Sequence, residues 1–226
     1  MTAADQQEVE GSQPTLFDRL KPAMSEDRLG TYLITAGFDP DRALRLYVWN
    51  AAIGEAFHLP IQGVEVGLRN RINGALIAMF GPEWWQDAGF LRAIGGDRER
   101  LSDLDMARRR IARRGVPLTT GQTVATLSFG FWVGMLHARY NPGIWSGQLR
   151  TAFPSLPPAK NRYDLADSAK RVSELRNRIW HHEPVFRMNL MAEFTAVMEL
   201  LTWVCPVKAA WIRPQCRVPA LMRQKP

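Results

Sequence analysis

Residues 163–184 read Tyr-Asp-Leu-Ala-Asp-Ser-Ala-Lys-Arg-Val-Ser-Glu-Leu-Arg-Asn-Arg-Ile-Trp-His-His-Glu-Pro. On an ideal helix that turns about 100° per residue, four apolar side chains of this stretch share one face. They are Leu165, Ala169, Val172 and Ile179. Arg176 falls in the middle of the same face, at about 20° from Leu165. The stretch therefore predicts an amphipathic helix that carries one arginine on its packing side.

The chain on both sides of this stretch has the same helical periodicity and little strand-like alternation. Capping residues, prolines and glycines mark where the other helices begin and end. We expect them over residues 25–37, 39–58, 61–80, 97–114, 124–140 and 189–205. The fold class predicted is therefore all-α, a helical bundle, with residues 1–13 as a disordered tail and 14–226 as one helical domain.

The composition fits a globular chain with a basic surface. Of 226 residues, 46% are hydrophobic and 23% charged, and the net charge is +7. Arginine supplies most of the positive charge, and its guanidinium can bind phosphate with two hydrogen bonds. A GC-rich genome also favours arginine codons, so charge alone indicates a polyanionic partner without identifying it.

Several classes of protein lack support in the sequence. Cys205 and Cys216 form no zinc-binding pattern, and no phosphate-binding glycine loop or zinc-protease motif is present. The longest apolar run, 124–136, is shorter than the roughly 20 residues needed to cross a bilayer. Residues 1–13 do not resemble a signal peptide. We expect a cytoplasmic protein with reduced thiols, no membrane contact, no metal and no cofactor.

The candidate catalytic residues are Arg176, Asn177 and His181. Asn177 and His181 are four residues apart, so they lie above one another on a helix. Pro184 should end the helix near His182, which would put His181 in the last turn, where the negative helix end favours a protonated ring. Because a buried, unpaired guanidinium costs several kcal/mol, Arg176 needs a carboxylate partner, or else its helix face opens into a cleft or a subunit interface.

Three further residues are candidates for supporting roles. Glu65 and Arg69 are spaced for an ordinary ion pair within one helix. The alternative is that Glu65 is the carboxylate that pairs with Arg176 and orients it. His182 is either a second proton carrier or RNA contact, or simply a surface histidine.

A basic cluster is the candidate RNA-binding surface, together with Arg178. An exposed helical face of this kind is often only solvated, whereas an RNA-binding surface would lose affinity steeply with salt. The cluster consists of Arg108, Arg109, Arg110, Arg113 and Arg114.

The run Leu-Arg-Asn-Arg-Ile-Trp-His-His-Glu-Pro-Val-Phe at 175–186 resembles the C-terminal signature of the Abi-like (abortive infection) proteins of the HEPN superfamily, whose hallmark is Arg, four residues, His. Segments 45–57, 64–70 and 127–132 resemble other parts of that family in the same order. The resemblance implies a helical bundle, a homodimer, and a ribonuclease site formed where two motif helices meet. Trp180 departs from the pattern, where a small residue is expected.

These observations predict a metal-independent endoribonuclease of a phage-defence or toxin-like system. RNA would be the substrate, attacked by its own 2′-hydroxyl to give 2′,3′-cyclic phosphate and 5′-hydroxyl ends. The expected partners are a second copy of the chain and an antitoxin or other regulatory protein. Two alternatives remain: a non-catalytic RNA-binding or protein-interaction module with the same fold, and a dimer in which Arg176 only closes an interface ion pair.

Overall fold

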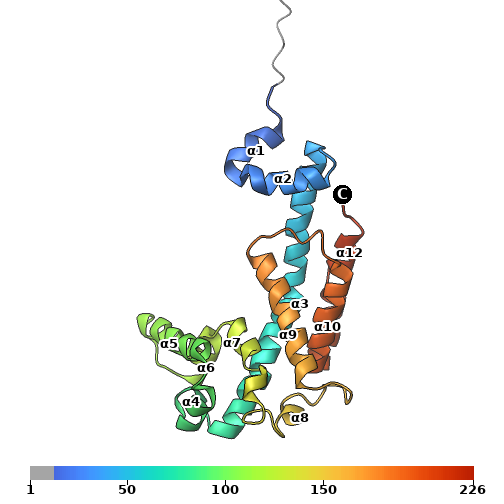
Figure 1. Cartoon of the computed structure of the whole chain (residues 1–226). Coiled ribbons are helices and arrows are strands. Elements are labelled where there is room, and N and C mark those ends of the chain that lie inside the picture. The colour runs from blue at the N-terminus through green and yellow to red at the C-terminus, as the bar shows by residue number, and fades with distance from the viewer. Residues whose placement is uncertain (1–12) are drawn as a thin grey trace, which may run out of the picture. The chain divides into compact units, whose positions relative to one another are not determined.

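The computed structural model describes residues 13–226, and every regular element in that part of the chain is a helix (Figure 1). The all-α prediction is therefore confirmed. Contacts divide the chain into a smaller unit, which ends at Ala52 and includes 224–226, and a larger unit, Ile53–Arg223. Of the predicted tail, residues 1–12 lie outside the described residues. The assignment of 14–226 to one domain stays a prediction.

The smaller unit contains α1 (Leu16–Met24), α2 (Glu26–Thr35) and the first turns of α3 (Pro40–Phe80). Polar side chains begin all three helices by accepting backbone N–H groups that have no partner within the helix. Thr15 does this for α1, Ser25 for α2 and Asp39 for α3. The starts of α2 and α3 therefore agree with the capping residues expected from the sequence.

Helix α3 is one continuous helix of 41 residues, with Pro60 inside it. The prediction of two helices separated near Pro60 was wrong. Proline removes one backbone hydrogen bond, and an isolated helix would often break there. The chain instead continues because apolar side chains on both sides of Pro60 are packed into the core. They are Ile53, Phe57, Ile61, Val64, Leu68 and Ile72.

Two glycines on α3 let the C-terminal helices approach closely. A Cβ on Gly63 would lie 2.8 Å from Ile212 Cδ1, and one on Gly67 would lie 2.7 Å from Val204 Cγ1. Arg71, one turn further on, donates from Nε to the Val204 carbonyl at 3.0 Å. Backbone and side chains of α3 thus hold the end of α10 (Leu190–Val204) and the helix after it.

The connection after α3 is deeply buried. Trp84 and Trp85, in η1 (Trp84–Gln86), are almost completely covered from solvent. Two helices follow, α4 (Ala88–Ile94) and α5 (Arg98–Arg113). The predicted charged helix at 97–114 is therefore present, but one of its faces packs inward.

The apolar segment at 124–140 is not one helix, as predicted, but three short pieces. They are α6 (Thr120–Thr126), α7 (Phe129–Gly134) and η2 (Ala138–Tyr140). Ser128 causes the first break, because its Oγ accepts the Phe131 N–H and starts a new helix. His137 does the same for η2 through Nδ1. Side-chain capping therefore outweighs the apolar pattern.

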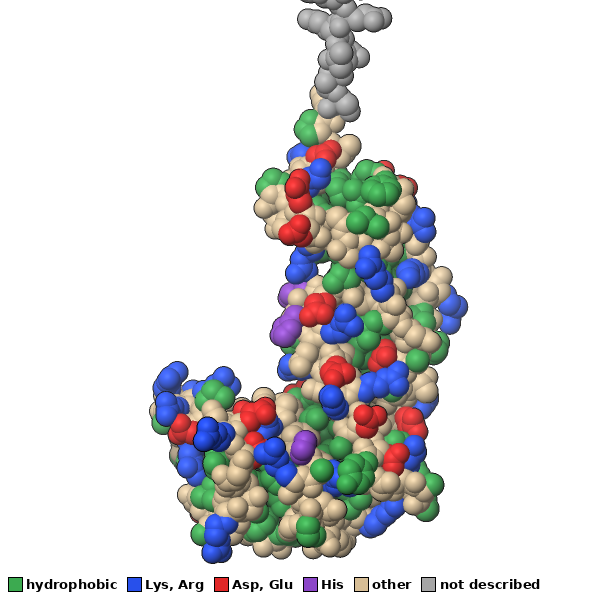
Figure 2. Space-filling model, viewed as in Figure 1, with side chains coloured by type: hydrophobic (Ala, Val, Ile, Leu, Met, Phe, Trp, Pro, Cys, Tyr) green, Lys and Arg blue, Asp and Glu red, His purple; other side chains and the backbone are tan. Residues whose placement is uncertain are grey.

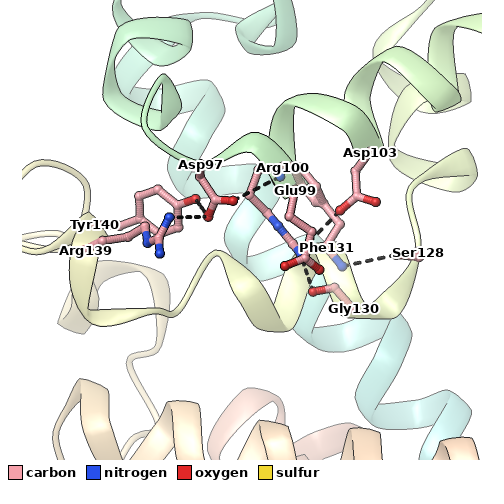
Figure 3. Close-up of polar contacts among 9 residues, drawn as sticks. All are labelled: Asp97, Glu99, Arg100, Asp103, Ser128, Gly130, Phe131, Arg139 and Tyr140. Carbon is pink, nitrogen blue, oxygen red and sulfur yellow. Dashed lines mark hydrogen bonds and ion pairs between the residues drawn. The ribbon is translucent and has the colours of Figure 1, made fainter.

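Arg100 ties α5 to α7 through a buried guanidinium that is only 3% exposed (Figure 3). Its Nη1 donates to the Gly130 carbonyl at 2.7 Å, and the carboxylates of Glu99 and Asp103 pair with the same group. The Gly134 position leaves no space for a Cβ next to this guanidinium. The charge is thus fully partnered and holds α5 in place.

Asp97 links the start of α5 to η2 (Figure 3). Its carboxylate accepts the Arg100 N–H at 3.2 Å and the Tyr140 hydroxyl at 2.6 Å, and it pairs with Arg139 at 3.2 Å. Burial raises the pKa of Asp97, but these contacts outweigh it and the pKa is lowered overall. Burial and the contact with Asp97 raise the pKa of Tyr140.

The C-terminal part of the larger unit begins with α8 (Leu149–Ala152) and an irregular loop over residues 153–160. Arg150 stabilises this loop by donating to the carbonyls of residues 156, 157, 158 and 160. Helix α9 (Arg162–Trp180) follows and packs against α10 and α7. The chain then ends with α11 (Pro206–Ile212), η3 (Arg213–Gln215) and α12 (Val218–Met222).

Candidate functional site

Helix α9 ends in a tight backbone cap at the double histidine. His181 is the C-cap residue, and His182 follows it with φ of 56°. The His182 N–H donates to the Ile179 carbonyl, and the Glu183 N–H donates to the Arg178 carbonyl. This is the Schellman arrangement, in which glycine is the usual residue at the position that His182 occupies. The helix ends at Trp180, so His181 lies just after the last turn rather than within it.

The Arg176 guanidinium has three neighbours. Its Nε lies 3.8 Å from Glu65 Oε2, and both side chains are largely covered, with 29% and 27% exposed. Its Nη1 donates to Asn177 Oδ1 at 3.3 Å, and its Cζ lies 5.0 Å from the Trp180 ring centre. Glu65 is therefore next to Arg176, which agrees with the alternative that Glu65 pairs with Arg176.

The ring of Trp180 also contacts a histidine that the sequence patterns did not indicate as a site residue. His58 stacks on it, with 5.2 Å between ring centres and 19° between ring planes. His58 and Glu65 are seven residues apart, which on a continuous helix puts them about 20° from each other. The seven-residue spacing is visible in the sequence, but it indicates a shared face only if the helix continues past His58, where it was predicted to end.

Arg69 does not belong to the group around Arg176. No ion pair joins it to Glu65 among the described residues, although the spacing favours one. The Arg69 Nε is buried without a hydrogen-bond partner. The pKa of Lys208 on α11 is lowered mainly by burial, and the charge of Arg69 lowers it further. Arg69 therefore faces the C-terminal helices rather than α9.

The imidazole of His181 is exposed, and within the described residues it forms no hydrogen bond, ion pair or ring contact. Arg178, which was expected to contact RNA, pairs through Nε with Glu183 at 3.1 Å. The end of α9 thus presents Asn177 and His181 to solvent, whereas Arg176 is half-buried next to Glu65 of α3.

The basic cluster on α5 is only partly available to a ligand, although Figure 2 shows Lys and Arg side chains gathered over this helix. Arg108 donates to the Trp85 carbonyl at 2.9 Å, and Arg109 pairs with Asp105 at 2.6 Å. Arg110, Arg113 and Arg114 are exposed and form no hydrogen bond or ion pair within residues 13–226. Which of the arginines contact RNA stays a prediction.

Two further observations concern residues 13–226 alone. No helix there is long and apolar enough to span a bilayer. No group of three or more His, Cys, Asp or Glu side chains is placed to bind a metal ion together.

Comparison with protein-family models found no matching family, and comparisons with curated proteins and with solved structures found no match either. The likeness to Abi-like proteins therefore rests on the sequence segments alone, and membership of that family stays a prediction.

Proposed function

We propose that this protein is a metal-independent endoribonuclease and that Arg176, Asn177 and His181 form the core of its site. The observation that carries the proposal is the difference between two side chains at the end of α9, the exposed His181 and the half-buried Arg176. An exposed imidazole without a partner follows, five residues further along the chain, an arginine that Glu65 and Trp180 hold in a defined position. A ribonuclease that uses no metal needs these two groups: a proton carrier and a fixed positive charge.

In the proposed reaction an imidazole takes the proton of the ribose 2′-hydroxyl, and the freed oxygen attacks the adjacent phosphorus. The bond from phosphorus to the 5′-oxygen breaks, and a second group returns a proton to that oxygen. Arg176 stabilises the additional negative charge on the phosphate oxygens. Asn177 orients the guanidinium through the 3.3 Å contact with its Nη1. The products are a 2′,3′-cyclic phosphate and a 5′-hydroxyl.

The scheme requires a second proton-transfer group, and there are two sources of an imidazole for it. A homodimer would bring two copies of His181 together, as the resemblance to Abi-like proteins implies. His58 is a source within the same chain, because it lies against the Trp180 ring that also contacts Arg176. We propose the dimeric site and treat His58 as the residue that fixes Trp180 within it.

Trp180 then has a defined role in the proposed site. Its ring contacts both His58 and Arg176, so it supports the guanidinium. His58→Phe keeps an aromatic ring in this position, whereas His58→Ala removes it. We expect the first variant to cleave RNA nearly as well as the wild type and the second to be impaired.

The experiment that tests the function compares variants in EDTA. We expect wild-type protein to cleave RNA, and His181→Ala and Arg176→Ala to lose at least about a hundredfold in rate, the usual contribution of such groups. Lys170→Ala is the matched control, because it removes one exposed positive charge from the same helix. Because the proposed site uses His181 of both protomers, mixing the two inactive variants should not restore cleavage, and an excess of His181→Ala should inhibit the wild type by forming mixed dimers.

The competing hypothesis is that Arg176 only stabilises the fold or a dimer interface, in a non-catalytic RNA-binding or interaction module. The burial of its Nε favours this hypothesis. Under it, Arg176→Ala would lower stability or weaken self-association, and wild-type protein would cleave no RNA. Toxicity on expression that disappears in His181→Ala would instead support a phage-defence or toxin-like role, with RNA cleavage and an antitoxin or other regulatory partner.

A further inference from the structure

Arg162, at the start of α9, has an unusual hydrogen-bonding state for a buried arginine. It is only 5% exposed, and its Nη1 donates to the Leu136 carbonyl at 2.6 Å. Its Nε and Nη2 are both covered from solvent and have no hydrogen-bond partner. A buried guanidinium with unused donors is costly unless another group satisfies them.

The two unused donors lie on the edge of the guanidinium that binds oxyanions in a bidentate manner. The same helix shows this edge occupied in Arg171. There, Nε and Nη2 donate to the two carboxylate oxygens of Glu193 at 3.1 Å and 2.9 Å. Arg162 has the corresponding edge free, so a carboxylate of the same geometry would complete it.

Arg162 lines a groove of about 670 Å³ between α7, η2 and the first turns of α9. Val133 and Ala138 form apolar parts of its wall. His137 lies on the same wall, and its Nδ1 accepts the Arg139 N–H at 3.4 Å. The proton of the neutral ring is therefore on Nε2, which makes that nitrogen a donor.

Tyr163 covers the Arg162 guanidinium, with the ring centre 4.0 Å from Cζ. The Tyr163 side chain is 64% exposed, so its outward rotation costs little packing and uncovers the face of the guanidinium that it contacts. A cation–π contact involves the face of the guanidinium, so it leaves the in-plane N–H groups without acceptors. The covering ring thus does not remove the need for an oxyanion.

The acidic residues that line the groove do not satisfy Arg162. Asp164 accepts the Asn161 N–H at 2.9 Å and lies 3.3 Å from Lys160 Nζ, which accounts for its carboxylate. The charge of Asp167 raises the pKa of Arg171, although the contact with Glu193 is the larger cause. Asp167 thus acts on Arg171. With Lys170 also at the groove, charges of both signs surround the site. This balance suits a ligand with one negative charge better than a polyanion.

We propose that this groove binds a small molecule with one carboxylate attached to an apolar or aromatic body. The carboxylate would pair with Nε and Nη2 of Arg162, and the body would lie against Val133, Ala138 and the displaced Tyr163 ring. This proposal does not depend on RNA cleavage, because the motif residues Arg176 and His181 are at the other end of α9.

The test is a titration of ¹⁵N-labelled wild-type protein with benzoate, following the Nε–Hε resonance of Arg162. We expect a saturable shift with a Kd of about 1 mM or tighter. Benzyl alcohol, the neutral analogue, should give no such shift. Arg162→Lys keeps the charge but loses the two-donor edge, so affinity should fall at least about tenfold. Arg171→Lys is the matched control and should bind benzoate normally, because Glu193 already occupies its edge.

The proposal would be overturned by any of four results. They are no saturable response to benzoate, an equal response to benzyl alcohol, unchanged affinity in Arg162→Lys, or binding of inorganic phosphate without binding of benzoate. If Arg162→Lys does not fold, the comparison of benzoate with benzyl alcohol on the wild-type protein tests the proposal by itself.

Discussion

Arg176 on α9 and Glu65 on α3 face each other across the helix interface, with 3.8 Å between Nε and Oε2. The pair joins residues 111 positions apart in the sequence, and neither partner forms a second ion pair among the described residues. It thereby fixes the arginine of the proposed site to the long helix of the larger unit.

Glu65→Gln should lower RNA cleavage about tenfold, which corresponds to roughly 1.4 kcal/mol of transition-state stabilisation. The amide keeps the size of the side chain but no longer holds the guanidinium by charge. Because both partners are partly exposed, the free energy of unfolding should change by less than about 1 kcal/mol. Single-turnover rates and urea unfolding would measure the two effects.

Glu174→Gln provides the control for that prediction. Glu174 is an exposed carboxylate of α9 that lies 3.8 Å from Lys170, away from Arg176. Its substitution should leave cleavage unchanged. Equal rates for wild type and Glu65→Gln would show that Glu65 does not position Arg176.

His182→Gly should stabilise the protein. His182 has φ of 56°, a conformation that costs a residue with a Cβ about 1–2 kcal/mol. Glycine avoids this cost but loses more backbone entropy on folding, so we expect a net gain of about 0.5–1 kcal/mol in urea unfolding. His181→Gly, at φ of −86°, should bring no such gain. If His182→Gly also retains cleavage, His182 is not the proton carrier; a loss of stability would contradict the role of the backbone cap.

Gly134→Ala should destabilise the larger unit by about 1–3 kcal/mol, because the new methyl group would overlap the buried Arg100 guanidinium. Gly130→Ala is a control on the same helix, where a Cβ would meet only Ser128 Oγ at 3.6 Å. Thermal unfolding of both variants distinguishes a local clash from a general intolerance of alanine in α7. Equal stability of the two variants would contradict the close packing of Arg100 on Gly134.

The pKa of Tyr140 is raised, first by burial and then by its hydrogen bond to Asp97. The folded state thus favours the neutral phenol, and this contribution to stability is complete below pH of about 10, the ordinary tyrosine value. It is lost as the pH rises towards the folded-state pKa. Above pH 10, the free energy of unfolding of Tyr140→Phe should therefore fall less steeply with pH than that of the wild type. Urea unfolding at a series of pH values would measure this difference. An unchanged slope would argue against a buried, neutral Tyr140.

Much of the fold was predictable from local patterns, because capping side chains act over three or four residues. Ser25, Asp39 and Asn189 each begin the helix that they were expected to begin. The errors came where local and tertiary effects compete. Pro60 suggested a helix end, but burial on both sides keeps α3 intact. In the opposite sense, the apolar run at 124–140 suggested one helix, and Ser128 breaks it.

The candidate site was predictable only in part for the same reason. An arginine on an apolar face indicated a carboxylate partner, and Glu65 was one of the alternatives considered for it. The stack of His58 on Trp180 was missed, because its register depends on the continuity of α3 through Pro60. The unsatisfied edge of Arg162 could not be inferred at all, since it depends on where the Leu136 carbonyl lies.

The measurement that tests the central claim most directly is the chemistry of the ends produced from a defined RNA in EDTA. Wild-type protein should give 2′,3′-cyclic phosphate and 5′-hydroxyl ends, and a single 2′-deoxynucleotide at the cleavage position should block the reaction there. The same RNA with His181→Ala should remain intact. Products with 5′-phosphate ends, cleavage at the 2′-deoxy position, or no cleavage by the wild type would contradict the proposed function.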